Sequence, residues 1–350
     1  MFYFCSPIQY NVVMDFSIKV KDYSEVCVGS VADLLPRLLP DKRVIVISDT
    51  NLDRYYHSML EPFDHILIGL GESSKTLLTI DTIYRRLIEL GADRSTFILG
   101  IGGGIVTDIA GFAAATYMRG VEFGFVSTTL LGQVDASVGG KNGVNVDGYK
   151  NMVGTFRQPR FVICDVNLLR TLPVREFRSG LAEIIKSGII ADKELFEMLE
   201  NADFSTLQRD TTLLQQIVYR AISVKASIVE RDECETGDRR LLNLGHTLAH
   251  AIEKTSSKMN HGEAVAVGLS LIAEVAVKGG LLAQSDNERI QNLLQRAGFC
   301  LESPIAMSQM LKAISKDKKS EGNFINAVFP RAIGECIVEK MPLDEFKALF

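Results

Sequence analysis

The sequence predicts an α/β domain followed by a mainly α-helical domain, and three observations support this division. Up to Asp165, short apolar runs rich in β-branched residues alternate with segments of helical periodicity, as in a parallel sheet with crossover helices. A run of glycines, 102–104, separates one of these strands from a helix of small residues. After Pro173 the periodicity is helical almost throughout. We therefore place the two domains at residues 1–172 and 173–350.

The composition is that of a soluble globular protein. A chain of 350 residues with 47% hydrophobic and 23% charged residues can form two domains with sizeable cores. The net charge of -5 is spread along the chain without a basic stripe, which argues against nucleic acid as a partner. No apolar run approaches the roughly 20 residues of a membrane span, and the N-terminus lacks the features of a signal peptide. The six cysteines are far apart and form no C-x-x-C pair, so we expect a cytoplasmic protein.

The first strand that we expect, residues 43–48, ends in polar residues. Asp49 and Asn51 follow it directly and are candidates for contacts with a ribose or a base, although an ordinary turn explains them equally well. A second strand is expected at residues 66–70. The helix that follows has its apolar positions at helical spacing and ends at Gly91; these positions are Ile80, Ile83, Tyr84, Leu87 and Ile88.

The strand expected at residues 97–101 runs into the glycine turn and then into a helix over residues 105–118. This order lets backbone N–H groups and a helix N-terminus approach a phosphate, and it indicates a Rossmann-like nucleotide-binding domain. The run is G-x-G-G-G instead of G-x-G-x-x-G, and no clear acid lies about twenty residues on, so we expect a dinucleotide held in a non-standard way. Asp108 faces this cofactor or complements the helix dipole.

Two further strands are expected in the first domain, at residues 122–127 and 161–165. Thr128 and Thr129 follow the first of them and place hydroxyls near the cofactor. Between the strands lies a glycine-rich segment, residues 133–151, which we interpret as a long functional loop. Its lysines, Lys141 and Lys150, suggest that it binds a phosphate or a carboxylate.

Three of the five histidines lie close together in the second domain. His246 and His250 are four residues apart and share one face of a helix, and His261 opens the next helix. Such a group can assemble a zinc site, whereas any one of these histidines alone would more often satisfy hydrogen bonds. The metalloprotease pattern H-E-x-x-H is excluded because Thr247 follows His246.

A glutamate and a lysine, Glu183 and Lys186, lie on an apolar helix where charged groups need partners. A metal held by Glu183 together with His246 and His261 would leave a coordination position for a substrate oxygen. A surface ion pair between Glu183 and Lys186 is the alternative. Near the end of the chain, residues 323–329 and 336–339 predict a small strand pair before a closing helix.

Taken together, these motifs give the chain a resemblance to the 3-dehydroquinate synthase family over nearly its whole length. The motifs are residues 102–104 with Asp108, 117–120, 135–141, 148–151, 183–186, 243–250, 261–263 and 317–319. The resemblance implies a dehydroquinate synthase-like fold, NAD as cofactor, zinc or alternatively cobalt as the metal, and a homodimer. One departure is Asn142 after Lys141, where many relatives carry threonine, and this leaves the hydrogen bonding near the cofactor open.

The resemblance also implies roles for individual residues. The metal ligands are Glu183, His246 and His261, with His250 turned toward the substrate. The implied NAD contacts are Asp49, Asn51, Glu72, Lys75, Gly103, Gly104, Asp108, Thr128, Thr129, Lys141 and Lys150. The implied substrate pocket is Asp135, Lys141, Asn151, Lys186, Lys225, Arg239, Asn243, His250 and one lysine of residues 316–319, for which we choose Lys318. Of these, Lys186, His250, Asp135, Arg239 and Asn243 are expected to be catalytic.

The reaction that the resemblance implies converts 3-deoxy-D-arabino-heptulosonate 7-phosphate, a phosphorylated sugar acid, into 3-dehydroquinate and phosphate in the shikimate pathway. It proceeds by transient oxidation with NAD, elimination of phosphate, re-reduction and intramolecular aldol closure. The alternatives are a cyclase that makes an inosose or a valiolone, a metal-dependent polyol dehydrogenase of related fold, and an inactive NAD-binding regulator. Arg239, Asn243 and His250 favour the dehydroquinate type.

Overall fold

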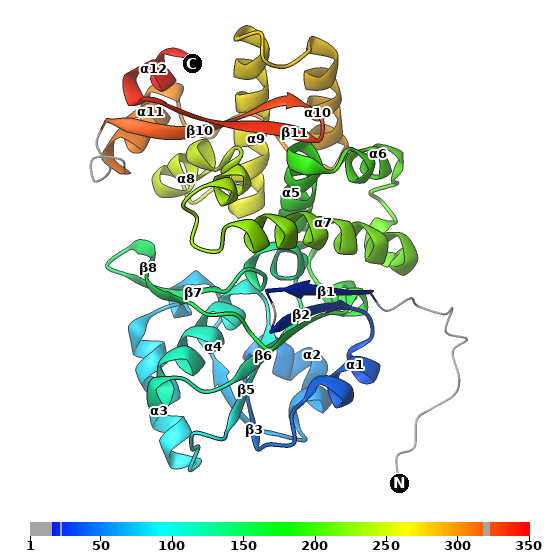
Figure 1. Ribbon diagram of the computed structural model, residues 1–350, viewed down its shortest axis with the longest axis vertical. Helices are drawn as coiled ribbons and strands as arrows, with labels where there is room; N and C mark the ends of the chain where they lie inside the picture. Colours follow the sequence, from blue (N-terminus) through cyan, green and yellow to red (C-terminus); the bar gives the residue numbers. More distant parts are fainter. Residues whose placement is uncertain (1–15, 22, 318–322) are drawn as a thin grey trace.

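The computed structural model describes residues 16–21, 23–317 and 323–350, and it consists of two stacked parts (Figure 1). The first part is built on a seven-stranded sheet, and the second is mainly helical. No helix of the described residues is both long and apolar enough to cross a membrane.

The large sheet has the strand order β1-β2-β9-β6-β5-β3-β4. Its strands are β1 (Phe16–Val20), β2 (Ser24–Val28), β3 (Val44–Asp49), β4 (Asp64–Ile68), β5 (Phe97–Gly102), β6 (Phe123–Ser127) and β9 (Phe161–Cys164). All neighbouring strands run parallel except β1 and β2. The five strands predicted from the sequence are therefore confirmed to within about two residues, which is the usual uncertainty of element ends. The antiparallel pair β1 and β2 was not expected.

The order of the strands locates a ligand-binding edge. From β3 the chain passes to β4 on one side and then to β5 on the other side, so the connections diverge between β3 and β5. Open α/β sheets bind ligands at the carboxyl ends of the strands at such a divergence. Here β3 ends at Asp49 and β5 ends at Gly102, directly before helix α4 (Gly104–Thr116). The glycine turn and the polar end of β3 thus meet at one edge.

Three more helices cover this sheet: α1 (Val31–Leu38), α2 (Thr50–Leu60) and α3 (Leu77–Glu89). Helix α3 buries Ile80, Ile83 and Leu87 and is followed by Gly91 with a positive φ of 68°, as predicted. The last of the apolar positions, Ile88, is 67% exposed. Ile88 follows Leu87 by one residue, about 100° around the helix, and this takes it off the buried stripe.

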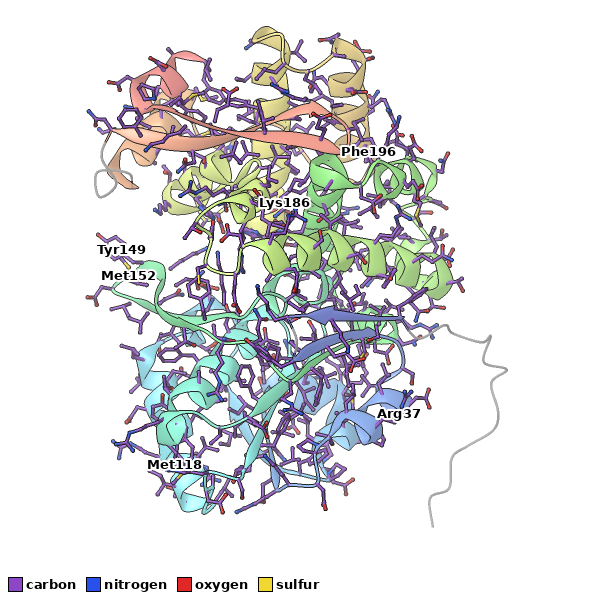
Figure 2. The ribbon with its side chains drawn as sticks, viewed as in Figure 1. Arg37, Met118, Tyr149, Met152, Lys186 and Phe196 are labelled. Carbon is purple, nitrogen blue, oxygen red and sulfur yellow. The ribbon has the colours of Figure 1, made fainter. Side chains whose placement is uncertain are left out.

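The glycine-rich segment is not a long loop. After a short π-helical turn (Gly132–Ala136), strands β7 (Lys141–Val146) and β8 (Tyr149–Phe156) form an antiparallel hairpin. Asp147 and Gly148 turn the chain, with φ of 50° and 80°. Two left-handed residues of the type Asp-Gly are the usual turn of a two-residue hairpin. Tyr149 and Met152 lie near its projecting tip, with 61% and 62% of their surface exposed (Figure 2).

The residue that departs from the family pattern, Asn142, fastens the base of the hairpin. Its side chain is buried, and its Nδ2 donates hydrogen bonds of 2.9 Å to the carbonyls of Gly140 and Arg157. Its Oδ1 packs against Gly111 of α4, where an added Cβ would lie 1.9 Å away. Asn142 therefore satisfies buried backbone groups, and none of its hydrogen bonds is directed at the cofactor edge.

The second part is built around helix α5 (Val174–Ala191), which is buried from Ser179 to Ile190. The surrounding helices are α6 (Lys193–Asn201), α7 (Thr211–Arg231), α8 (His246–Thr255), α9 (His261–Lys278), α10 (Gln284–Arg296) and α11 (Met307–Asp317). The predicted strand pair is confirmed as β10 (Phe324–Ala332) and β11 (Glu335–Pro342), and α12 (Leu343–Ala348) is the closing helix.

Close packing of α9 on α5 predicts a large effect of Gly262→Ala. The added Cβ would lie 2.3 Å from the Cα of Ser179 on α5, and backbone cannot move aside cheaply. We expect a loss of about 2 kcal/mol or more in the free energy of unfolding, as for other overpacked cores. Denaturant unfolding monitored by circular dichroism measures this loss.

The matched control is Gly279→Ala at the other end of α9, where the nearest atom would lie 3.5 Å away. This variant should stay within about 0.5 kcal/mol of the wild type. Equal stability of the two variants would show that α5 and α9 are not packed as described.

Candidate active site

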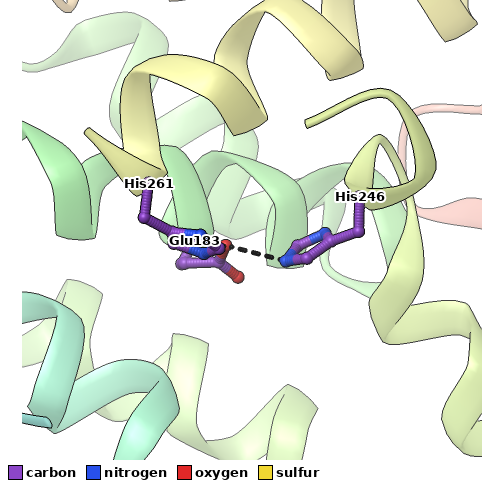
Figure 3. Close-up of side chains that lie close together, drawn as sticks. All are labelled: Glu183, His246 and His261. Carbon is purple, nitrogen blue, oxygen red and sulfur yellow. Dashed lines mark hydrogen bonds and ion pairs between the residues drawn. The ribbon is translucent and has the colours of Figure 1, made fainter. Parts of the chain in front are cut away.

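Three ligand atoms converge between α5, α8 and α9. Glu183 lies in the middle of α5, and His246 and His261 are the first residues of α8 and α9 (Figure 3). The Nε2 atoms of His246 and His261 lie 3.4 Å and 3.3 Å from Oε1 of Glu183. One atom from each of the three residues lies within 4.8 Å of the others, which is close enough for a single metal ion.

Both imidazoles are held by their second nitrogen. Nδ1 of His246 lies 3.1 Å from the carbonyl oxygen of Leu244, so this nitrogen carries the proton and donates it. Nδ1 of His261 lies 3.6 Å from a carboxylate oxygen of Glu253. Each Nε2 is therefore directed at Glu183, with its lone pair available when the ring is neutral. Two imidazole nitrogens and one carboxylate oxygen are a usual catalytic zinc set, so these residues fit the metal.

The carboxylate of Glu183 is almost completely buried, with 2% of its side chain exposed, and it forms an ion pair with the equally buried Lys186. Burial alone would raise the pKa of Glu183, but the charge of Lys186 and the two histidines hold it well below its usual value. Figure 2 shows Lys186 within the helical part, toward the middle of the molecule. A surface ion pair, the alternative considered from the sequence, is excluded by this burial.

His250, which lies on α8 with His246, is not one of the three converging residues. Its ring contacts that of His246 edge-on at 5.5 Å between centroids, and its side chain is exposed. Desolvation by the neighbouring protein and the charge of His246 lower the pKa of His250 to about 4. The lowered pKa favours the neutral imidazole, whose free ring nitrogen can accept a hydrogen bond.

A second group of charged side chains lies between the π-helical turn and α7. Lys225 of α7 is buried, and its Nζ lies 2.5 Å from Oδ1 and 2.6 Å from the backbone oxygen of Asp135. Burial would raise the pKa of Asp135, but the charge of Lys225 outweighs it and the pKa is lowered. The buried guanidinium of Arg239 donates to the carbonyl oxygens of Glu233 and Gly139.

Glu235 was not expected from the sequence, but it lies among the predicted pocket residues. It forms an ion pair with Lys141 of the hairpin, and its other oxygen accepts a hydrogen bond of 2.5 Å from Asn243. Glu235 also has a positive φ of 62°, which is uncommon for a glutamate. Its backbone conformation and its contacts distinguish Glu235 from other glutamates of the chain. The spacing of residues in the sequence reveals none of these features.

The predicted cofactor residues meet at the carboxyl edge of the sheet. Gly103 caps α4 there and Gly104 begins it, and a Cβ on Gly103 would lie 2.7 Å from Cγ2 of Thr129, so a larger residue would displace that side chain. Thr128 is buried, and Thr129 accepts a hydrogen bond from the backbone of Gly132. At the end of β3, Asp49 caps α2 by accepting from the N–H groups of Asn51 and Leu52.

The remaining cofactor candidates connect this edge to the hairpin. Lys75 is buried between Asp108 of α4 and Asn151 of β8, with its Nζ 2.5 Å from an oxygen of each. Burial raises the pKa of Asp108 to about 6, against the lowering effect of Lys75. Glu72 accepts a hydrogen bond from Asn145 of β7, and Lys150 lies 2.9 Å from Glu253 of α8. Lys318 lies outside the described residues.

The sequence matches known proteins over most of its length. Residues 65–179 match the description 3-dehydroquinate synthase N-terminal, and residues 180–320 match 3-dehydroquinate synthase C-terminal. The chain is 44% identical over 287 residues to the 3-dehydroquinate synthase of Pelobacter propionicus, covering 81% of this chain and 80% of that protein. It is 40% identical over 332 residues to that of Synechocystis, covering 91% and 92%. The chain belongs to the 3-dehydroquinate synthase family.

Solved structures with the same fold include other cyclases. A 2-epi-5-epi-valiolone synthase from Streptomyces hygroscopicus subsp. jinggangensis, with NAD+ and Zn2+ bound, is 25% identical with a TM-score of 0.84, covering 99% of this chain and 98% of that one. A 2-deoxy-scyllo-inosose synthase with carbaglucose-6-phosphate, NAD+ and Co2+ is 25% identical with a TM-score of 0.82, covering 96% and 99%. A probable glycerol dehydrogenase from Sinorhizobium meliloti, at 15% identity and a TM-score of 0.59, shares the fold alone. The predicted fold class is confirmed, and the 3-dehydroquinate synthase family is favoured over the alternatives.

The geometry of the three ligands predicts that metal binding depends on pH. Burial lowers the pKa of His261, but its bonds to Glu183 and Glu253 outweigh this effect and raise the pKa to about 10. Below that pH a metal ion must displace a proton from His261, so the apparent affinity should rise about tenfold for each pH unit between roughly 6 and 8. Competition with a chromophoric chelator measures this slope, and calorimetry in buffers of different ionisation enthalpy measures the released proton. An affinity that does not change with pH would contradict the arrangement.

Proposed function

We propose that this protein catalyses the 3-dehydroquinate synthase reaction, the conversion of 3-deoxy-D-arabino-heptulosonate 7-phosphate into 3-dehydroquinate and phosphate. The observation that carries the proposal is the convergence of Glu183, His246 and His261 beside the buried cations Lys186 and Lys225. This arrangement combines a site for a Lewis acid with fixed positive charge for an anionic substrate. Membership of the family at 44% identity supports the same reaction.

We assign the binding of NAD to residues 1–172 and the binding of metal and substrate mainly to residues 173–350, with Asp135, Lys141 and Asn151 of the first domain completing the substrate pocket. The carboxyl edge of the sheet would hold the dinucleotide, with its phosphates against the N-terminus of α4 at Gly103 and Gly104. The side chains proposed to contact NAD are Asp49, Asn51, Glu72, Lys75, Asp108, Thr128, Thr129, Lys141 and Lys150. Glu183, His246 and His261 would hold zinc or cobalt. When bound, NAD supplies a reversible hydride acceptor and the metal supplies a Lewis acid.

The side chains of the pocket divide between binding and proton transfer. We assign the phosphate and carboxylate of the substrate to its cationic side chains, Lys141, Lys186, Lys225, Arg239 and Lys318, because ammonium and guanidinium groups bind these anions strongly. Their fixed charge also stabilises the negative charge that develops as phosphate leaves. Asn151 and Asn243 would orient hydroxyl groups. We assign proton transfer to His250 and Asp135, whose lowered pKa values favour the neutral imidazole and the ionised carboxylate.

The alternatives make different products. A sibling cyclase would act on a sugar phosphate without the carboxylate, and a dehydrogenase would release NADH. The solved valiolone and inosose synthases are 25% identical to this chain, whereas the 3-dehydroquinate synthases reach 44%. The family relatives therefore favour the sugar acid as substrate.

The test is release of phosphate from the sugar-acid phosphate in the presence of catalytic NAD+ and zinc. We expect phosphate release without net NADH, because the hydride returns within one turnover. Lys186→Ala should lower kcat/KM by about 100-fold or more, as expected for the loss of a preorganised charge, and His261→Ala should abolish metal-dependent turnover.

Lys193→Ala is the matched control, since the Lys193 side chain is 63% exposed on α6. It should retain activity within about twofold, because an exposed ion pair contributes little. Two outcomes would contradict the proposal. One is accumulation of NADH with simple polyols. The other is release of phosphate from a sugar phosphate that lacks the carboxylate, with none from the sugar-acid phosphate.

We also propose that the protein works as a homodimer in the cytoplasm. The exposed apolar side chains of the hairpin, Tyr149, Met152 and Phe156, are 52% to 62% exposed and suit a contact between subunits. Of the described cysteines, Cys164, Cys234, Cys300 and Cys336 form no disulfide, which suits a reducing compartment. Sedimentation of the purified protein tests the oligomeric state.

A further inference from the structure

The candidate site leaves one buried carboxylate without an assigned role, that of Glu253. It lies on α8 seven residues after the ligand His246 and three after His250, so the three side chains share one face of the helix. Only 9% of the Glu253 side chain is exposed. A buried carboxylate requires cationic or hydrogen-bonding partners, and Glu253 has two, one in each part of the molecule.

The two partners use different oxygens of the carboxylate. Oε2 lies 3.6 Å from Nδ1 of His261, the ligand that opens α9. Oε1 lies 2.9 Å from Nζ of Lys150 on the β7–β8 hairpin. Glu253 is therefore placed between a metal ligand and a strand of the other domain.

The hairpin is held to its own domain by the next residue. Asn151 has a left-handed backbone with φ of 53°, and its Oδ1 lies 2.5 Å from Nζ of Lys75, which also contacts Asp108 at the cofactor edge. Two consecutive residues of β8 thus have partners in different parts of the molecule. Lys150 contacts Glu253, next to the proposed metal ligands, and Asn151 contacts Lys75, next to the nucleotide edge.

We propose that Glu253 is a positioning residue that fixes the ring of His261 for the metal and holds the hairpin against α8 through Lys150. This inference rests on the proposed metal site. A carboxylate that accepts the Nδ1 proton fixes the tautomer of a histidine ligand and makes its other nitrogen a better donor. The same carboxylate forms the ion pair with Lys150, so Glu253 contacts both a proposed metal ligand and the hairpin.

The test compares Glu253→Ala, Glu253→Gln and Lys150→Met in the full chain with zinc and cobalt as probes. We expect Glu253→Ala to weaken zinc binding by about 10- to 100-fold, the usual effect of removing such a partner, and to change the visible spectrum of the cobalt-loaded protein. Glu253→Gln should fall between the wild type and Glu253→Ala, because it keeps a polar oxygen near Nδ1 of His261 but loses the charge. Lys150→Met should bind zinc within about threefold of the wild type, since His261 keeps its partner.

Hydrogen exchange of the hairpin amides, residues 144–153, provides a second measurement. Exchange should be faster in all three variants, because each removes the charged contact between Glu253 and Lys150. Glu274→Ala, an exposed carboxylate on α9, is the matched control and should change neither zinc affinity nor exchange. If Glu253→Ala binds zinc with wild-type affinity, or if its hairpin amides exchange at the wild-type rate, the role of Glu253 is wrong but the proposed metal site is unaffected. A wild-type protein that binds no zinc would overturn the metal site and the inference together.

Discussion

The structure depends on one buried charge, the carboxylate of Glu183. Removing an ionised carboxylate from water costs several kcal/mol even after the protein relaxes, and this cost must be offset by partners at short range. Lys186, one turn along the same helix, offsets part of it. The remaining partners, His246 and His261, come from the first turns of two other helices. The packing of α5, α8 and α9 is therefore tied to the chemistry of the site, because each helix supplies one group around this carboxylate.

Contacts of the hairpin and of strand β1 connect the two domains. The hairpin extends from the sheet toward α8, and its consecutive residues Lys150 and Asn151 have partners on opposite sides. The edge strand β1 is also supported by the second domain, since Phe16 stacks on Tyr219 of α7 with 4.4 Å between ring centroids. Hydride transfer requires the cofactor and the substrate to be held in fixed geometry, and these contacts provide such a connection.

The sequence predicts those parts of the fold that depend on local pattern. The strands rich in β-branched residues and the buried helices were predicted because their periodicity is set by neighbours in the chain. Strands β1 and β2 were missed because charged residues, Lys19 in β1 and Glu25 in β2, interrupt their apolar pattern. The hairpin was missed because the Asp147-Gly148 turn lies among many other glycines.

The candidate site was predictable to the extent that its residues stand in recognisable motifs, as the two helix-opening histidines do. Glu235 and Glu253 were not predicted, because what distinguishes them is their contacts with Lys141 and Lys150, more than 90 residues away along the chain. Spacing along the chain carries no signal for such pairs.

We propose that one metal ion is bound by two imidazole nitrogens and the carboxylate of Glu183. X-ray absorption at the zinc edge of the loaded protein tests this claim most directly. We predict a first shell of nitrogen and oxygen at about 2.0–2.2 Å with two imidazole rings and no sulfur. In Glu183→Gln, zinc should bind more weakly, because a neutral amide replaces the carboxylate. A shell containing sulfur at about 2.3 Å, or an unchanged spectrum and affinity in Glu183→Gln, would contradict the account.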